Sequence, residues 1–407
     1  MEYRTLSSLF YQNKDDYKNE YEKRIHSHDA IYFPININGH HSFLVPNWEM
    51  ISLVESIGKN NTVAYAFFSK LPGVAQIYYI RKCLIDEIQT TNDIEGVNST
   101  RKEITFALNA KESTSKLARF QGMAKKYEKL LQDETYDMPF STCADIRSLY
   151  DELVSNEIAD SEQPDGMLFR KNTVFVVTKT QQIKHEGVNP EQEIIRLLEY
   201  ALSILENNQL PILVRIATFH YFFGYIHPFY DGNGRISRFI SSYLLRKNGF
   251  LLSALDFSHT IKDNRKKYYT AFQKCNDKRN KGDVTPFVLM FLEFLNIASE
   301  RMSENLFEGL KRLDHFEQTI KESLFIGDKL RDKKSTILSL FIQNGLFAAE
   351  PFLISELCKH MSCSRSTLEK LLNSLINDGY PIFKIKDGKY LRYGIEINKF
   401  EEMIDNL

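Results

Sequence analysis

The segment from His227 to Arg238, HPFYDGNGRISR, combines residue types that can act together on a phosphate-containing ligand. The imidazole of His227 can accept a proton near neutral pH. Gly232, Asn233 and Gly234 tolerate left-handed backbone angles, so successive N–H groups can surround an anion. A helix that begins at about Gly234 would direct the positive end of its dipole at the same place. The spacing therefore predicts a polyphosphate-binding loop.

Three charged side chains complete this loop. Arg235 and Arg238 are three positions apart on the expected helix, so both can face one anion. Asp231 can hold Mg²⁺, which usually binds one or two carboxylates together with phosphate oxygens. The alternative is a glycine-rich connection between two buried helices, with surface arginines and a core histidine. The combination of all these residue types in one short segment favours the ligand site, and the lack of a Gly-Lys-Ser/Thr sequence excludes an ordinary P-loop.

The same segment resembles the Fic family, whose pattern His-x-Phe-x-Asp/Glu-Gly-Asn-Gly-Arg-x-x-Arg it matches at every fixed position. The resemblance implies a helical Fic core that transfers AMP from ATP to a Ser, Thr or Tyr hydroxyl of a target protein. It implies that His227 deprotonates the attacking hydroxyl and that Asp231 holds Mg²⁺ on the phosphates. Residues 232–234 would bind the α- and β-phosphates, Arg235 would belong to the same nucleotide-binding set, and Arg238 would bind the γ-phosphate.

Two further segments extend the resemblance. IKDNRKKYYTAFQKCN is similar to the family's nucleoside pocket, with Tyr268 and Asn276 as the adenosine contacts, although a Tyr pair on a helix is more often part of a core. The β-branched run NTVFVVTKTQQI, residues 172–183, predicts a hairpin where the family carries a flap that aligns the target by strand addition. Phe229 is expected to anchor the loop by packing. The nucleotide-facing part of the flap is expected to be Val174, Phe175, Val176 and Val177.

The sequence TNDIEG matches the family's inhibitory pattern Ser/Thr-x-x-x-Glu-Gly/Asn at Thr91, Glu95 and Gly96. By this resemblance Glu95 pairs with Arg238, and an arginine paired in this way cannot hold a γ-phosphate. The alternative is a helix C-cap at Gly96 with a solvated Glu95. We expect low wild-type activity that Glu95→Gly increases, unless His227 is also replaced. The same glutamate could instead orient a water that removes AMP from a modified target, and transfer of another nucleotide is also compatible with this sequence.

Hydrophobic periodicity predicts a mainly α protein, because apolar residues recur at helical spacing through most of the chain. The segment 31–46 is expected to form a small sheet or an irregular cover, and the first 73 residues suggest no mechanism. The predicted domains are an N-terminal region with the inhibitory helix, a Fic catalytic core, and a winged helix-turn-helix domain, at residues 1–110, 111–326 and 327–407. Helices are predicted from Pro72 to about Glu95, and over residues 103–131, 190–207, 210–226 and 286–316.

The winged-helix prediction rests on three candidate helices followed by a hairpin around Asp387-Gly388, after a charged linker at 327–335. Residues 331–407 contain eleven Lys or Arg and ten Asp or Glu, a net charge of +1. A DNA-binding regulator is the alternative function, but specific duplex binders usually have a clearer basic face. We therefore favour a protein-interaction or dimerisation role for this domain. Its basic cluster is confined to the wing, at Lys384, Lys386, Lys389 and Arg392.

Overall composition restricts the classes of function and the cellular location that the chain can have. The 407 residues carry a net charge of −1, which provides no general attraction to nucleic acid or anionic membranes. The sequence lacks an apolar run long enough to span a bilayer and a leader-like N-terminus, so we expect a cytoplasmic protein without membrane contact. Five scattered cysteines favour reduced core residues over disulfides or a zinc site at CKHMSC. The target protein, self-modification and a homodimer are left undecided by the sequence.

Overall fold

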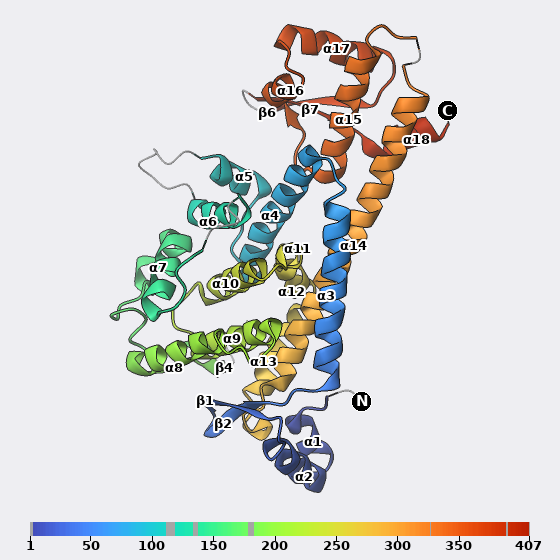
Figure 1. Ribbon diagram of the computed structural model, residues 1–407. Helices are drawn as coiled ribbons and strands as arrows, with labels where there is room; N and C mark the ends of the chain where they lie inside the picture. The colour runs from blue at the N-terminus through green and yellow to red at the C-terminus, as the bar shows by residue number, and fades with distance from the viewer. Residues whose placement is uncertain are drawn as a thin grey trace. The chain divides into compact units, whose positions relative to one another are not determined.

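The computed structural model describes residues 3–110, 119–132, 137–177, 183–325, 327–387 and 390–406 (Figure 1). Contacts within the chain divide it into two compact units. Unit 1 comprises Met1–Thr62 and Leu84–Arg301, and unit 2 comprises Val63–Cys83 and Met302–Leu407. Three helices contribute residues to both units, namely α3 (Trp48–Phe68), α4 (Gly73–Glu95) and α14 (Thr285–Glu322). The domain boundaries expected at residues 110 and 326 stay a prediction.

Unit 1 is mainly helical, as predicted, and contains two antiparallel two-stranded sheets. The segment 31–46 forms the first sheet, which confirms the expected small sheet. The elements of this unit besides the shared helices are α1 (Leu6–Gln12), α2 (Lys14–Ile25), β1 (Ile31–Ile37), β2 (His40–Leu44), α5 (Arg101–Asn109), α6 (Gln121–Gln132), α7 (Cys143–Leu153), η1 (Ser155–Glu157), η2 (Asp160–Glu162), β3 (Phe175–Val177), β4 (Ile183–Glu186), α8 (Glu191–Ile204), α9 (Ile212–Ile226), α10 (Asn233–Lys247), α11 (Leu251–Ala254), α12 (Phe257–Asp263), α13 (Arg265–Cys275) and η3 (Lys278–Asn280).

The helices α8, α9 and α10 lie side by side in unit 1 (Figure 1). The sequence of α9, ILVRIATFHYFFGYI, is apolar on nearly all sides, which is typical of a helix surrounded by other elements. Phe219 and Phe223 of α9 and Ile236 and Phe239 of α10 are fully buried. This close packing fixes the two helices, and the short segment that joins them lies at their common end.

Local sequence explains where several helices begin, and it also shows where one prediction was wrong. The side chain of Thr100 accepts a hydrogen bond from the backbone of Glu103, whose carboxylate binds back to Thr100, so a capping box starts α5. A single helix was expected over residues 103–131, but α5 ends at Asn109 and α6 starts only at Gln121. Phe120, just before α6, has a left-handed backbone with φ of 64°, which breaks helical continuity. Residues 111–118 lie outside the described residues.

Unit 2 contains a three-stranded antiparallel sheet in the order β5-β7-β6. Fully buried Phe341, Phe352, Leu368 and Leu372 form part of its core. The predicted hairpin is present as β6 and β7, and its turn at 388–389 lies outside the described residues. The elements that belong to this unit alone are α15 (Arg331–Phe347), β5 (Phe352–Leu353), α16 (Ile354–His360), α17 (Arg365–Asn377), β6 (Ile382–Asp387), β7 (Tyr390–Ile395) and α18 (Ile397–Asp405).

The charged stretch 327–335 was expected to be a linker, and this prediction was wrong from Arg331 onward, where α15 begins. The reason is that its charges have partners. Lys334 Nζ lies 2.7 Å from Asp328 Oδ2 and 2.8 Å from Asp378 Oδ2, and its side chain is buried. A charged sequence can therefore start a packed helix when it is neutralised locally.

The structure bears on the predictions for the cysteines and for membrane-spanning segments. All five cysteines are free, as expected, although only Cys143 and Cys275 are fully buried. Among the residues that the structure describes, none of the helices combines the length and the apolar character needed to cross a membrane.

Candidate active site

The loop between α9 and α10 has two left-handed residues that reverse the chain direction. His227 ends α9 with φ of 54° and ψ of 62°, and its N–H donates to the Phe223 carbonyl at 3.0 Å. Gly232 has φ of 83°, a conformation that favours glycine, and α10 starts at the next residue. Gly232 therefore adopts the unusual backbone angles that were predicted for it, and His227 is the first residue of the same loop.

The interior of this loop is held by reciprocal bonds. Asn233 Oδ1 accepts from the Phe229 N–H at 3.0 Å, and Asn233 Nδ2 donates to the Phe229 carbonyl at 2.8 Å. The Phe229 ring is fully buried and stacks on Tyr150 with a centroid distance of 4.0 Å. The prediction that Phe229 anchors the loop by packing is confirmed, and the Asn233 amide serves first to brace the loop.

Arg170 connects the loop to the hairpin β3–β4, a role that sequence reasoning missed. Its buried guanidinium donates to the carbonyls of His227 at 2.9 Å, Val188 at 2.8 Å and Asn172 at 2.6 Å. A guanidinium has five N–H donors in a fixed plane, so it can hold several carbonyls at once. The loop and the base of the hairpin consequently share one brace.

A cavity of about 160 Å³ lies over this loop. Seven of the residues that line it were predicted from the sequence as catalytic, nucleotide-binding or inhibitory. They are Glu95, His227, Asn233, Gly234, Arg238, Tyr268 and Asn276. The other lining residues were missed, namely His185, Gly224, Ser237, Tyr269, Phe272 and Gln273. A concave lining that combines aromatic residues with a few polar and charged groups is typical of a small-molecule site.

Arg238 is almost completely buried and is held by the end of α4. Its Nη2 lies 2.7 Å from Glu95 Oε1 and donates to the Thr91 carbonyl at 3.0 Å, while Nε donates to Thr91 Oγ1 at 2.7 Å. Burial alone would lower the pKa of Arg238, but the carboxylate of Glu95 raises it above its ordinary value. A side chain at Gly234 would collide with the Glu95 carboxylate, so this glycine allows the approach. Gly96 follows with φ of 76°, which ends α4.

Two imidazoles face the cavity, and each is bound to a carbonyl in the last turn of α9. His185 Nε2 lies 2.5 Å from the Tyr225 carbonyl, and His227 is hydrogen bonded to the backbone of Gly224. Limited contact with water lowers the pKa of both rings, for His227 to about 4, and a neutral ring has one N–H and one lone pair. Since a carbonyl only accepts, each N–H is used there, and each ring keeps a lone pair for another group. His185 had no local sequence signal, because it comes from a strand far from the motif.

The adenosine contacts expected from the resemblance have defined partners. Tyr268 and the pocket residue Ser237 both bond to the buried His220, at 2.7 and 3.1 Å. Burial lowers the pKa of His220 to about 3, so this ring is neutral. Asn276 Oδ1 accepts from the Tyr221 hydroxyl at 2.7 Å. Because the Asn276 oxygen is engaged, its NH₂ group is the part that remains for a ligand.

Arg235 and Asp231 were predicted to face the same ligand as Arg238, but neither lines the cavity. Arg235 Nη1 lies 2.9 Å from Glu157 Oε2, and both side chains are buried. Asp231 is half-exposed, with Oδ1 accepting from the Gly232 N–H at 2.6 Å and Oδ2 lying 4.0 Å from Arg235. The two arginines of the motif thus bind different acids, because Glu157 comes from η1 and Glu95 from α4.

The structure describes only part of the segment that was predicted to form the flap. β3 and β4 pair antiparallel, with Val176 opposite His185. The Val174 carbonyl accepts from the Gly187 N–H at 2.9 Å, and Phe175 is 47% exposed. The side chains of Val176 and Val177 and all of residues 178–182 lie outside the described residues. Of the described side chains in this segment, neither Val174 nor Phe175 lines the cavity.

Comparison with known proteins agrees with the family resemblance of the segment 227–238. Residues 140–245 match the Fic/DOC family. This segment carries a Fic domain. The chain is 31% identical over 124 residues to the protein adenylyltransferase Fic of Drosophila mojavensis, which covers 30% of this chain and 22% of that protein. It is 34% identical over 96 residues to the protein of the same name from Aedes aegypti. This match covers 24% of this chain and 17% of that protein. The chain thus matches less than a quarter of the length of these curated relatives.

The Fic domain also has a structural counterpart. The crystal structure of a Fic family protein from Desulfovibrio desulfuricans G20 aligns with a TM-score of 0.50 and 21% identity, covering 86% of this chain and 97% of that chain. At this identity the likeness concerns the fold. The mainly helical architecture with small hairpins is therefore a Fic-type fold.

Proposed function

We propose that the Fic domain transfers AMP from ATP to a Ser, Thr or Tyr hydroxyl of a target protein. The observation that carries this proposal is the cavity in which His227, Gly234 and Arg238 meet Tyr268 and Asn276. The name protein adenylyltransferase, which the matched relatives carry, agrees with it. The expected cytoplasmic location belongs to the same proposal.

The roles follow from the contacts around the cavity. The neutral His227 ring accepts the proton of the attacking hydroxyl at its free nitrogen. The hydroxyl oxygen forms a bond to the α-phosphorus, the bond from the α-phosphorus to the bridging oxygen breaks, and pyrophosphate leaves. The backbone N–H groups of Asn233 and Gly234 at the start of α10 attract the phosphates, whereas the Gly232 N–H is bonded to Asp231. Arg238 binds the terminal phosphate. Tyr268 and Asn276 hold the nucleoside.

Asp231 is the residue that would hold Mg²⁺. Its carboxylate is half-exposed at the edge of the loop. The ion pair of Asp231 with Arg235 is long, at 4.0 Å, because Arg235 is bound more closely to Glu157, at 2.9 Å. A single carboxylate with phosphate oxygens is a usual Mg²⁺ environment, so the residues fit this ion. When bound, Mg²⁺ would neutralise charge on the phosphates. Arg235, in contrast, would support the loop rather than bind the nucleotide directly.

Glu95 is proposed to restrain the enzyme. The ion pair with Arg238 occupies the guanidinium that the terminal phosphate needs, and Thr91 holds the same guanidinium from two sides. ATP would then bind in a pose unsuited to attack on its α-phosphorus. Release of the last turn of α4, which Gly96 ends, would free Arg238.

The test measures label from α-³²P-ATP on purified protein and on a lysate. Wild type, Glu95→Gly and Glu95→Gly/His227→Ala are compared. We expect little label with wild type, at least ~10-fold more with Glu95→Gly, and none with the double variant, because restraint and base act on the same step. Label that is equal in wild type and Glu95→Gly contradicts the restraint, and label that persists in the double variant contradicts the base.

Two other activities use the same residues and give different results in this assay. Removal of AMP from a modified target would appear as loss of label from a pre-labelled protein, with Glu95 orienting a water. Transfer of another nucleotide would appear when other labelled triphosphates replace ATP.

Residues 327–407 are proposed to form a winged helix-turn-helix domain that contacts protein. The order α15, β5, α16, α17, β6, β7 supports this assignment. A protein role is favoured over DNA because its basic side chains are partly engaged. Arg392 Nη2 lies 2.8 Å from Glu350, and Arg365 Nε lies 3.0 Å from Glu369.

A further inference from the structure

The N-terminal hairpin β1–β2 reaches the wall of the candidate nucleotide pocket. Its turn is Asn38-Gly39, with φ of 50° and 82°, the left-handed pair that suits a tight hairpin. The exposed Asn38 side chain donates from Nδ2 to the backbone carbonyl of Asn276 at 2.6 Å. Asn276 ends α13 and lines the cavity. A residue at the start of the chain therefore binds directly to one that was predicted to contact adenosine.

The same hairpin also contacts the helix that leads to His227. The Tyr225 hydroxyl donates to the Asn36 carbonyl at 3.1 Å. Tyr225 precedes His227 by two residues, and its own carbonyl binds His185. The hairpin thus contacts the last turn of α9 and the end of α13.

The segment between η3 and α14 is bound to strand β2 by backbone hydrogen bonds. Phe43 N–H donates to the Gly282 carbonyl at 3.0 Å, and Val284 N–H donates to the Phe43 carbonyl at 2.9 Å. A side chain at Gly282, where φ is 83°, would lie 2.6 Å from the His41 carbonyl. Only glycine permits this approach, so the close contact is built into the sequence.

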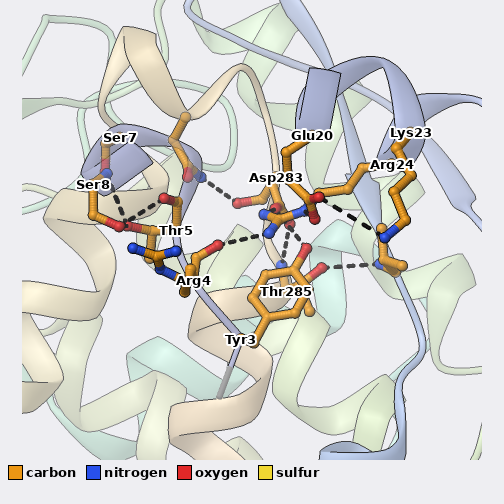
Figure 2. Close-up of polar contacts among 12 residues, drawn as sticks. Tyr3, Arg4, Thr5, Ser7, Ser8, Glu20, Lys23, Arg24, Asp283 and Thr285 are labelled. Atoms are coloured by element: carbon orange, nitrogen blue, oxygen red, sulfur yellow. Dashed lines mark hydrogen bonds and ion pairs between the residues drawn. The ribbon is translucent and has the colours of Figure 1, made fainter. Parts of the chain in front are cut away.

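A buried ion pair secures this segment from the other side (Figure 2). Asp283 is fully buried, and its Oδ2 accepts from Arg24 Nη1 at 3.0 Å and from the Tyr3 hydroxyl at 2.7 Å. Arg24 also donates to Glu20 at 2.9 Å and to the Arg4 carbonyl at 2.7 Å. Removal of a partner would leave an unpaired buried charge, so this network strongly resists displacement. The segment that follows Asn276 is consequently bound to the N-terminal residues in two ways, by backbone bonds to β2 and by side-chain bonds from Tyr3 and Arg24 to Asp283.

We propose that residues 3–45, the N-terminal module, position the nucleoside wall of the pocket, with Asn38 as the residue that acts on Asn276. This inference rests on the proposed nucleotide site. Tyr221 already engages the Asn276 oxygen, so the Asn276 NH₂ group is the part that a ligand acceptor would bind, and Asn38 fixes the backbone from which that group extends. The module therefore assists recognition of the nucleoside and has little effect on the phosphates, whose proposed contacts are Asn233, Gly234 and Arg238.

The test substitutes Asn38→Asp in the full chain carrying Glu95→Gly. The carboxylate keeps the size and turn preference of asparagine but replaces the donor with an acceptor that faces the Asn276 carbonyl. Asn36→Asp, the same change two residues away on an exposed side chain, is the matched control. Titration calorimetry measures ATP and inorganic tripolyphosphate, each with Mg²⁺. We expect about fivefold weaker ATP binding for Asn38→Asp, because one hydrogen bond is lost, with tripolyphosphate unchanged.

Each result has a defined meaning. ATP binding by Asn38→Asp that equals that of Asn36→Asp overturns the proposal. Parallel weakening of ATP and tripolyphosphate also overturns it, because a general loss of structure would affect both ligands. Asn38→Gly, which keeps the left-handed turn and removes the amide, should reproduce the selective loss if Asn38→Asp folds poorly. If the Glu95→Gly parent binds no ATP, the nucleotide function itself fails and this inference with it.

Discussion

At the scale of single residues, His227 differs from an exposed histidine in its ionisation. Its pKa is lowered to about 4, mainly by limited contact with water and also by the neighbouring His185 and Arg170, while Glu95 acts in the opposite direction. The neutral ring, which accepts a proton, is therefore the main form at any pH well above 4. Phosphates bound near the ring would stabilise its protonated form and so raise its pKa toward neutrality.

This reasoning predicts the titration of His227 in the full chain. With ¹³C-labelled histidine, the His227 signal should titrate near pH 4 without ligand, against about 6.5 for an ordinary histidine. Addition of ATP and Mg²⁺ to the Glu95→Gly chain should move the midpoint upward. The signal is assigned by its loss in His227→Ala. A ligand-free midpoint at the ordinary value would contradict the buried, neutral base.

At the scale of elements, α10 is fixed by two acid–arginine pairs that face different neighbours. Arg235 binds Glu157 of η1, and Arg238 binds Glu95 of α4. The first pair is the more enclosed, with side chains 1% and 8% exposed. It therefore supports the position of the motif helix, whereas the second pair is open to exchange with a ligand.

We predict that Glu157→Ala destabilises the protein by about 3–5 kcal/mol, because the buried Arg235 charge then keeps only the distant Asp231 as a partner. Urea unfolding followed by circular dichroism measures the change. Glu162→Ala, on the exposed side of η2, is the control and should stay within about 0.5 kcal/mol of wild type. Equal transitions for the two variants would show that the pair does not hold α10.

The sequence predicted those parts of the site whose spacing is local. The glycines, Asn233 and Arg238 follow one another within a helical turn of the loop, and periodicity on α13 could also have identified Gln273 from Tyr269 and Asn276. Glu95, Tyr268 and Asn276, which are distant from the loop in the chain, were predicted only through the family resemblance. Other contacts between distant segments had no signal. His185 reaches the cavity from a strand, and Glu157 takes Arg235 away from the site that its three-residue spacing to Arg238 suggested. These outcomes depend on tertiary packing, which periodicity does not encode.

At the scale of the whole molecule, acidic and basic residues nearly balance. The net charge is −1 for the chain and +1 for residues 331–407. Of the wing cations, Arg392 is bound to Glu350 and to the Pro351 carbonyl, and Lys389 lies outside the described residues. Lys384 and Lys386 line a cavity near the start of α17 together with Arg365, which pairs with Glu369. Among the described cations of the wing and the start of α17, Arg392 and Arg365 are thus already paired with acids, which leaves Lys384 and Lys386 to neutralise phosphates along a duplex.

We therefore predict that the full chain does not shift random duplex DNA at about 1 µM protein and about 150 mM salt, because non-specific binders with many phosphate contacts have dissociation constants of about 10⁻⁴–10⁻⁶ M under such conditions. A gel-shift series over salt concentration measures this, with Lys384→Gln/Lys386→Gln as the matched variant. A shift that weakens steeply with salt and disappears in the variant would assign the domain to DNA. Absence of a shift in both proteins, together with unchanged AMP transfer by the variant, would leave protein contact as the function that its charge distribution fits.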